Sequence, residues 1–571
     1  MLSRYHILMG FMQGLLLLLL HEGMVHEWGV VIAPEFAFPA YTMVLLLPIM
    51  TMLCIQFSDR AALLRLLVAG SIVFLILGVC SGSMAFSPVD KNSFNGIFVF
   101  ALAMLALFYI GLPFIQSWMR AGSWHFSYKD LYEFGWLNTQ TLIMGGLFTG
   151  LVWAILGLCG ALFKLISISL FADMFSDVYF IYPTTGMMFA YGVSLGMQHF
   201  DIKNVHKTDF FFRFVTLLIA LVAVLFLMGL TVSGLQPLWD TRYATFLLLW
   251  LQVFVVLFVN GLFQYGYQQR DEPGWVRWSI SVALLAMPAF SLICVYAMSL
   301  RVEQYGWTED RVWASLAIAI LTIYVLGYAA AALRGLMGKG DWLAWLMPSN
   351  IIAACTIVCV AALTSLPFFS PVHIAVESQV SRLLSGQVKA NAFDFDYLRF
   401  EAGRVGLEKL DILMNVEGLE QSALIRKYAE TARNKVKRWG PVNPIDGIEK
   451  PDVAKYFTVY PEGHGLDASS VKFFYENRKS MFNECFSAVA PCKVLYINLN
   501  DDALDEMIVF EDAFSWKTLY AKRHNKWQRA GYIEETSGSR VGQEVLNIKD
   551  VEAVNSSWKR LRIGDRFFDV K

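Results

Sequence analysis

Long apolar runs recur along the first two thirds of the 571-residue chain, and they constrain its fold more than any other feature. Each run approaches the roughly 20 residues that an α-helix needs to cross the hydrocarbon core of a bilayer. Short polar segments separate eleven runs, at 7–20, 40–57, 61–80, 94–118, 138–164, 179–198, 210–232, 243–264, 279–300, 312–333 and 345–367. The sequence therefore predicts an α-helical polytopic membrane bundle of about 10–11 transmembrane helices.

Two of these runs are ambiguous. The run 7–20 is short for a full crossing. The run 179–198 contains the stretch from Pro183 to Gly186, and proline inside a helix removes a backbone hydrogen bond. The first run either spans or stops short, and the second spans, breaks or re-enters the membrane.

Charge is distributed unevenly between two parts of the chain. Residues 1–367 hold 17 basic and 18 acidic residues, whereas the remaining 204 residues hold 29 of each. This step predicts a transmembrane helical domain at 1–367 and a soluble domain at 368–571. The formal net charge of −1 gives no surplus of cations, which argues against a nucleic-acid partner.

Cations beside the runs predict the orientation, because short loops rich in Lys and Arg remain cytoplasmic. With a cytoplasmic N-terminus the inner side holds twelve cations, namely Arg4, Arg60, Arg65, Arg120, Lys129, Lys203, Lys207, Arg213, Arg270, Arg277, Arg334 and Lys339. The outer side holds five, namely Lys91, Lys164, Arg242, Arg301 and Arg311. The soluble domain is therefore expected outside the cytoplasm.

Cysteine usage bears on the same question. Six of the eight cysteines lie in apolar runs, where Cys behaves as a small hydrophobic residue. Only Cys485 and Cys492 lie in the soluble domain. They are expected to form a disulfide in an oxidising compartment, and the alternative is two thiols in a reducing one.

The soluble domain is predicted to be α+β, with helices first and an antiparallel β meander second. A helix is expected to start at Ser370 and Pro371 and to end near Gly386. After the cysteines the apolar period changes to two, in the segments 493–498, 506–510, 516–523, 527–533 and 560–570. Residues 522–526 are expected to form a hairpin turn.

One predicted helix, between Leu419 and Trp439, has apolar residues on one face and cations on the other. A basic face usually does no more than contact solvent. The alternative is contact with an anionic lipid or envelope polymer through Lys435, Lys437 and Arg438.

An acidic segment at 498–506 lies between two predicted strands. Asn498, Asn500, Asp502 and Glu506 could supply oxygen ligands to calcium at alternate positions. The glycines that usually form such a turn are absent, so a polar hairpin loop is the competing interpretation. No other cofactor is expected.

Polar groups inside the apolar runs are costly unless they face a partner or water. Asn260 and Gln264 are four residues apart, and therefore share a helical face. Candidates around the ambiguous run 179–198 are Asp173, Asp177, Thr184 and Thr185. These groups could line an intramembrane polar pathway, or they could only hold helices together by hydrogen bonds.

The sequence contains no phosphate-binding loop, dinucleotide fingerprint, nucleophile elbow or zinc-protease motif. It therefore identifies no catalytic residue. If the chain were an enzyme acting on a lipid-linked substrate, Asp173, Asp177 and His199 would be the candidates.

The stretch PVHIAVESQVSRLLSGQVKANAFDFDYLRFEAGRVGLEKL after the last run resembles the bacterial membrane-protein family called domain of unknown function 4153. The many-helix N-terminal half and the segment VLYINLNDDALDEMIVFED are similar to that family as well. The resemblance implies a multi-pass inner-membrane protein of Gram-negative bacteria. It implies no activity, substrate or catalytic residue.

Three functions are consistent with these features. The first is an inner-membrane protein whose periplasmic domain binds or senses an envelope component or a protein partner. The second is a transporter or lipid flippase with a periplasmic cap, and the third is a membrane enzyme. Membrane lipids are partners in all three.

Overall fold

The computed structural model describes most of the chain. It covers residues 2–56, 59–85, 94–123, 126–166, 168–200, 209–240, 243–264, 272–338, 341–435, 438, 450–461, 463–477, 482, 485, 492–500, 504–510, 517–523, 526–533, 561–563 and 566–568. The chain forms two compact units. The first comprises 1–393 and 401–409, and the second comprises 394–400 and 410–571.

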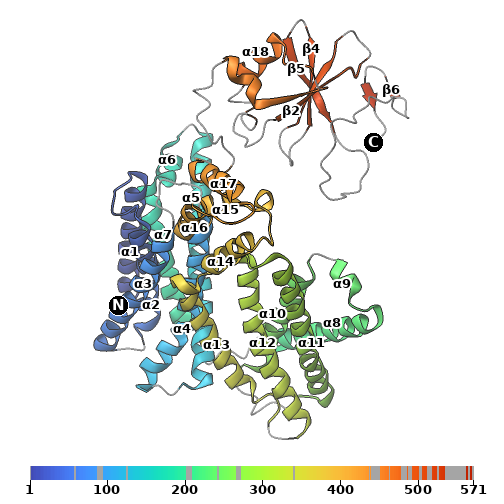
Figure 1. Ribbon diagram of the computed structural model, residues 1–571. Helices are drawn as coiled ribbons and strands as arrows, with labels where there is room; N and C mark the ends of the chain where they lie inside the picture. The colour runs from blue at the N-terminus through green and yellow to red at the C-terminus, as the bar shows by residue number, and fades with distance from the viewer. Residues whose placement is uncertain are drawn as a thin grey trace. The chain divides into compact units, whose positions relative to one another are not determined.

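The first unit is helical (Figure 1). Its elements are α1 (Leu2–Val25), α2 (Pro34–Cys54), α3 (Arg60–Met84), α4 (Phe94–Ala121), α5 (Tyr128–Leu165), α6 (Leu170–Ser176), α7 (Val178–His199), α8 (Asp209–Ser233), α9 (Gln236–Asp240), α10 (Ala244–Phe263), α11 (Gly274–Tyr305), α12 (Glu309–Leu336), α13 (Leu346–Thr364), η2 (Pro367–Phe369), α14 (Pro371–Leu384), η3 (Ala390–Ala392) and the start of α16 (Gly403–Leu413).

The second unit contains α15 (Phe395–Phe400), the end of α16, α17 (Ser422–Asn434), η5 (Lys450–Tyr456), β1 (Phe457–Tyr460), α18 (Ala468–Glu476), β2 (Cys492–Ile497), β3 (Glu506–Phe510), β4 (Lys517–Arg523), β5 (Lys526–Ile533), β6 (Leu561–Ile563) and β7 (Arg566–Phe568). Strands β1–β5 form one sheet in chain order, with β1 parallel to β2 and the others antiparallel. The predicted meander is confirmed for the four segments in β2–β5, and β1 makes this sheet mixed. The fifth predicted segment, 560–570, instead forms β6 and β7, which pair with each other in a separate sheet.

Ten helices in the described part of the chain are long and apolar enough to cross a membrane: α1–α5, α8 and α10–α13. The predicted class, a polytopic helical bundle followed by an α+β domain, is therefore confirmed. The short first run belongs to a long helix, because α1 extends to Val25. The ambiguous run 179–198 forms the continuous helix α7, which includes Pro183.

Helix α7 packs between α1 and α5 through two stripes of small residues. On one side, Gly186 lies so close to Gly10 of α1 that a Cβ on Gly186 would overlap the Gly10 carbonyl oxygen. On the other side, a Cβ on Gly192 would lie 2.8 Å from the Cα of Gly145 in α5. Small residues allow such close backbone approach, which strengthens helix packing in membranes.

The helices of this unit fall into two halves with separate cores. One core joins α1–α4 and α7, with Leu142 of α5 packed against it, and the other joins α8 and α10–α12. Helix α13 belongs to both, because Leu346 near its start packs in the second core and Ala361 near its end packs in the first. The last apolar helix therefore connects the two halves.

Contacts among α1, α2 and α3 define the two ends of the bundle. Nε2 of His6, near the start of α1, lies 3.3 Å from the carbonyl oxygen of Met52, near the end of α2. Gly82, near the end of α3, packs against Pro34 at the start of α2. Each helix therefore runs antiparallel to the one before it, and α3 ends opposite the N-terminus.

The end of α13 lies beside the end of α3. The hydroxyl of Ser81 in α3 donates a hydrogen bond of 3.2 Å to the carbonyl of Ser365, directly after α13. Since α3 ends opposite the N-terminus, α13 does so as well. The start of α1 and the end of α13 therefore lie at opposite ends of the bundle.

The second unit has its own hydrophobic core, built from α18 and the buried face of the sheet. Phe474 of α18 stacks on Phe457 of β1 with a ring-centroid distance of 4.1 Å, and both side chains are buried. The predicted disulfide is present, because Cys485 is bonded to Cys492 at the start of β2. Both cysteines are buried in this core.

Candidate functional site

A buried polar cluster joins the two halves of the helical unit, and its centre is Asn350 near the start of α13. Asn350 Nδ2 donates to the hydroxyl of Tyr128 in α5 at 2.6 Å and to Oδ1 of Asn260 in α10 at 2.7 Å. The hydroxyl of Tyr328 in α12 donates to Asn350 Oδ1 at 2.6 Å. Four helices therefore meet at one amide.

The geometry of this cluster favours a role in holding the helices together over a role in transport. Both amide hydrogens of Asn350 and its carbonyl oxygen are already engaged within the protein. Asn350 is 7% exposed and Tyr328 is 1% exposed. A polar group that is satisfied by neighbouring helices stabilises their association, and binding of a substrate here would require this cluster to open.

The predicted polar-pathway residues do not form one cluster. Asn260 belongs to the Asn350 cluster, and Gln264 is a buried residue just after α10. Asp173, Asp177, Thr184 and Thr185 belong to α6, the α7 cap and α7, which lie in the other half of the bundle.

Local hydrogen bonds account for several of these groups. Asp177 caps α7 by accepting a bond from the backbone N–H of Tyr179, and the hydroxyl of Thr185 accepts one from Trp153 Nε1 at 3.1 Å. Asp177 and His199 lie at opposite ends of the 22-residue helix α7. At 1.5 Å per residue they are separated by roughly 30 Å, so they cannot act on one substrate atom.

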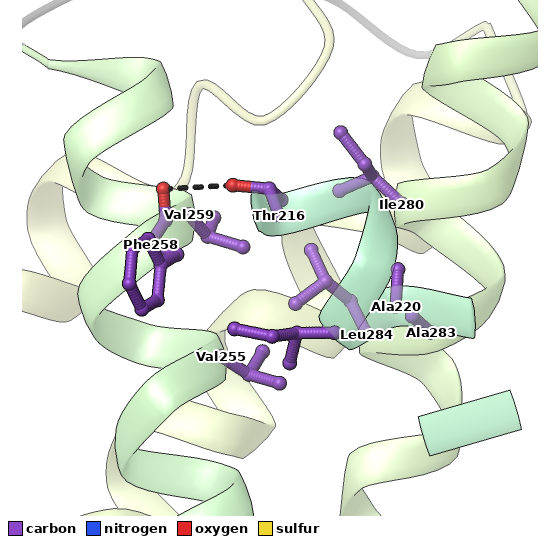
Figure 2. A pocket seen from close by; sticks show the side chains of 9 residues that line it. Thr216, Ala220, Val255, Phe258, Val259, Ile280, Ala283 and Leu284 are labelled. Carbon is purple, nitrogen blue, oxygen red and sulfur yellow. Dashed lines mark hydrogen bonds between the residues drawn. The ribbon is translucent and has the colours of Figure 1, made fainter. Parts of the chain in front are cut away.

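An apolar crevice lies between α8, α10 and α11 (Figure 2). Its lining is Thr216, Ile219, Ala220, Val255, Phe258, Val259, Ile280, Ala283 and Leu284. Figure 2 shows the Thr216 hydroxyl directed at the Phe258 carbonyl, to which it donates at 3.0 Å. The crevice volume is about 10 Å³, which is room for about one water molecule.

In the acidic loop, the buried carboxylate of Glu506 accepts a hydrogen bond of 2.8 Å from the backbone N–H of Leu499. This bond closes the connection between β2 and β3. Asn498 and Asn500 lie within this connection, and Asp502 lies outside the described residues. Strands β2 and β3 pair antiparallel on either side of this connection, and calcium binding stays a prediction.

The cations at the end of α17 have carboxylate partners from the segment around α15. Lys435 Nζ lies 2.6 Å from Oδ2 of Asp396, and Arg438 Nη2 lies 2.9 Å from Oδ2 of Asp394. Lys437 is outside the described residues. Contact with an anionic surface stays a prediction, and it would compete with these two ion pairs.

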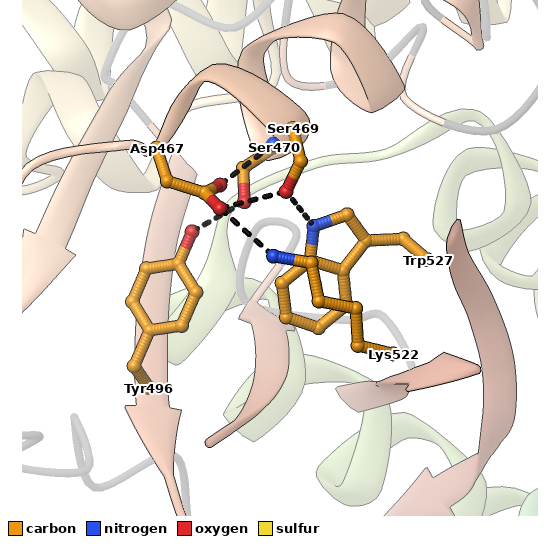
Figure 3. A network of polar contacts seen from close by, with 6 residues as sticks. All are labelled: Asp467, Ser469, Ser470, Tyr496, Lys522 and Trp527. Carbon is orange, nitrogen blue, oxygen red and sulfur yellow. Dashed lines mark hydrogen bonds and ion pairs between the residues drawn. The ribbon is translucent and has the colours of Figure 1, made fainter. Parts of the chain in front are cut away.

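A polar network anchors the start of α18 to the sheet (Figure 3). Asp467 caps α18 by accepting a bond of 2.7 Å from the backbone N–H of Ser470, and its other oxygen accepts from the Ser469 hydroxyl at 2.7 Å. Lys522 of β4 lies 3.0 Å from the same carboxylate. Ser469 also accepts a bond of 3.2 Å from Trp527 Nε1 of β5.

These contacts shift two pKa values. Partial burial opposes ionisation of Asp467, but the hydrogen bonds from Ser469, Ser470 and Lys522 outweigh it and hold the pKa well below its usual value. Burial, aided by the charge of Asp467, raises the pKa of Tyr496 to about 12, although its hydrogen bond to Ser470 opposes the rise. At neutral pH Asp467 is therefore negatively charged and Tyr496 is uncharged.

Asp467 is expected to make the start of α18 acid-sensitive. Its pKa is lower in the folded than in the unfolded chain, so its contribution is present above about pH 4 and is lost as pH falls through the folded pKa. Asp467→Asn keeps a good cap and loses the charge. Hydrogen exchange in residues 468–476 should be faster in the variant at pH 6, and the difference should shrink towards pH 2.5. An equal difference at both pH values would contradict this prediction.

Sequence reasoning found Asn260 but missed its partners Tyr128, Tyr328 and Asn350. Asn350 lies five residues into the last apolar run, and it was a detectable signal because a buried amide requires a hydrogen-bonding partner. The tyrosines gave a weaker signal. Tyr128 lies ten residues before the run 138–164, and a Tyr near the end of an apolar run, such as Tyr328, is also typical of the membrane interface.

Comparison with known proteins found a family but no individual relative. No curated protein matches the chain, and no solved structure matches it. The model of the family described as domain of unknown function DUF4153 matches residues 42–411, which extend from α2 into α16. The segment from 494 to 512, which also suggested the family, lies beyond the matched residues. Since the match covers more than half of the chain, the protein belongs to the DUF4153 family.

Proposed function

We propose that the protein is a multi-pass protein of the bacterial inner membrane, whose C-terminal unit lies in the periplasm and binds or senses an envelope component. The helical bundle would anchor this unit and receive its signal. The observation that carries the proposal is the position of Ser365, which lies at the opposite end of the bundle from the N-terminus.

This position supports an odd number of crossings. Ten helices have the length and composition of membrane spans. Helix α7 would be the eleventh, because it lies antiparallel along α1: Gln198 near its end approaches Ser3 at 3.5 Å, and Tyr182 near its start contacts His21 with ring centroids 5.2 Å apart. Together with the cation bias of the loops, eleven crossings favour a cytoplasmic N-terminus and an external second unit.

The disulfide supports the same orientation. The bond Cys485–Cys492 lies in the second unit, and the six other cysteines, all in the first unit, form none. Disulfides persist in the periplasm and are rare in the reducing cytoplasm.

Reporter fusions test the orientation. We expect green fluorescent protein fused after Met337 to fluoresce, and alkaline phosphatase fused after Lys571 of the full chain to be active. Met337 follows α12 and precedes α13, so the two sites should lie on opposite sides. A fluorescent, phosphatase-inactive fusion at Lys571 would overturn the periplasmic assignment.

Binding is tested with the full chain in lipid nanodiscs, by hydrogen exchange of the second unit. The probes are lipopolysaccharide micelles and soluble peptidoglycan fragments, added separately. We expect one of them to slow exchange at a defined set of peptides. Unchanged exchange with both probes would leave orientation intact and would exclude these two classes of ligand.

A transport function is favoured by one observation, the division of the bundle into two halves that meet at the Asn350 cluster. It predicts that reconstituted vesicles move a fluorescent phospholipid between leaflets and that Asn260→Ala abolishes this movement. Activity in both the wild type and the variant would show that transport does not depend on the Asn350 cluster. The satisfied hydrogen bonds of Asn350 favour sensing as the first function to test.

A further inference from the structure

Helix α14 donates hydrogen bonds to the C-terminal end of α11. The last carbonyl groups of any α-helix lack partners within the helix. In α11, three of these are Glu303, Gln304 and Tyr305. Arg382 of α14 donates to Glu303 O at 3.3 Å and to Gln304 O at 2.7 Å, and Gln379 donates to Tyr305 O at 3.0 Å.

The turn after α11 is held by α14 as well. Gln379 also donates to Trp307 O at 2.7 Å, and the Ser378 hydroxyl accepts from Trp307 N at 3.0 Å. Gly306, which lies between Tyr305 and Trp307, has a positive φ of +73°. A Cβ on Gly306 would lie 2.6 Å from Cδ of Arg382. Gly306 N–H already bonds the Val302 carbonyl, and three polar residues of α14 add bonds to the carbonyls and the turn that follow it.

An adjoining face of α14 is apolar and buried. Ala375, Val376, Val380 and Leu383 are each at most 4% exposed. Undocking of α14 would therefore expose apolar surface and leave the α11 carbonyls without these donors at the same time. Docking of α14 and order in the last turn of α11 should behave as one equilibrium.

The start of α16 ties the same segment to the other half of the bundle. Arg404 forms an ion pair with Glu35 in the first turn of α2, and Gly403 lies against the carbonyl of Met84 at the end of α3. Lys409 of α16 pairs with Glu377 of α14 at 2.5 Å. Residues 371–393 and 401–409, all in the first unit, therefore hold α11 of one half and the α2–α3 ends of the other.

We infer that residues 371–393 and 401–409 form a clasp through which the C-terminal unit controls the arrangement of the two halves; this inference rests on the proposed sensing function. The chain passes from the first unit to the second within α16. A change in the second unit that displaces α16 would loosen both anchor points. The family match ends at residue 411, so it includes the whole clasp and excludes most of the second unit.

The test is hydrogen exchange of the full chain in lipid nanodiscs. Arg382→Gln should accelerate exchange in residues 303–307 by about tenfold or more, because charge-assisted bonds to carbonyls are lost. Arg382→Lys keeps the charge and the fold but not the two-pronged contact, and it should give an intermediate effect. No acceleration in either variant would overturn the capping role.

The coupling between the two halves is tested at the contact of α16 with α2. Arg404→Gln, which removes the partner of Glu35, should accelerate exchange in residues 303–307 as well as at the start of α2. The control is Lys472→Gln, which removes a 3.8 Å ion pair with Glu476 inside α18 of the second unit and should change neither site. An Arg404→Gln effect confined to α2, or an equal effect of the control, would overturn the clasp. This experiment needs no ligand and no orientation, so its failure is distinct from failure of the proposed function.

Discussion

Gly186→Ala is expected to destabilise the bundle by about 2 kcal/mol or more, whereas Gly150→Ala should be neutral or stabilising by up to about 1 kcal/mol. Both glycines lie within long apolar helices, α7 and α5. Alanine is the better helix former at either place. The difference arises from packing alone.

A methyl group on Gly186 would overlap the carbonyl oxygen of Gly10, and backbone atoms cannot yield as a side chain can. Gly150 is exposed on α5, and nothing lies within 4 Å of its Cβ position. The midpoint of SDS-induced unfolding, followed by helical circular dichroism, measures both variants. Equal midpoints would show that the contact between α1 and α7 is looser than the structure indicates.

Removal of the disulfide should destabilise the second unit by about 2.5 kcal/mol. The bond closes a short loop with a sequence separation of 7, and closing such a loop lowers the entropy of the unfolded chain by about that amount. Denaturant unfolding of the second unit, monitored by hydrogen exchange in β2 and α18, should occur at a lower concentration in the double variant Cys485→Ala, Cys492→Ala.

A reducing agent provides the matched control for this variant. It should lower the stability of the wild type to near that of the double variant and leave the double variant unchanged. The six other cysteines carry no disulfide, so they offer no second target. Equal sensitivity of the wild type and the variant would mean that reduction acts elsewhere.

The architecture of this chain could be predicted because apolar length and charge are local properties of the sequence. The helix after Ser370 illustrates this point: α14 runs from Pro371 to Leu384, and Gly386 has a positive φ of +76°. The same holds for the hairpin in which Arg523 of β4 pairs with Lys526 of β5.

What the sequence did not predict depends on contacts between distant residues. The parallel strand β1 pairs Phe457 with Cys492, 35 residues later, and a four-residue strand has little signal of its own. The continuity of α7 depends on Gly10 and Gly145, which belong to other helices. Pro183 indicated a break, but tight packing on both sides keeps the helix intact.

The candidate sites were predictable in composition but not in arrangement. Asn260 was found because an amide in an apolar run is costly. Its partner Asn350 lies 90 residues away, and no local pattern joins them. The positive charge of Lys435 and Arg438 was predictable, but the carboxylates of Asp396 and Asp394 that neutralise it were not.

Helix α13 packs in both hydrophobic cores, and this has a consequence for biosynthesis. Its residues complete both cores, with Leu346 in one and Ala361 in the other. During translation, neither half can close its interior until the ribosome has made this segment, even though chains generally fold from the N-terminus as they emerge. Nascent chains that stop after α12 should therefore be cleared rapidly by membrane proteases.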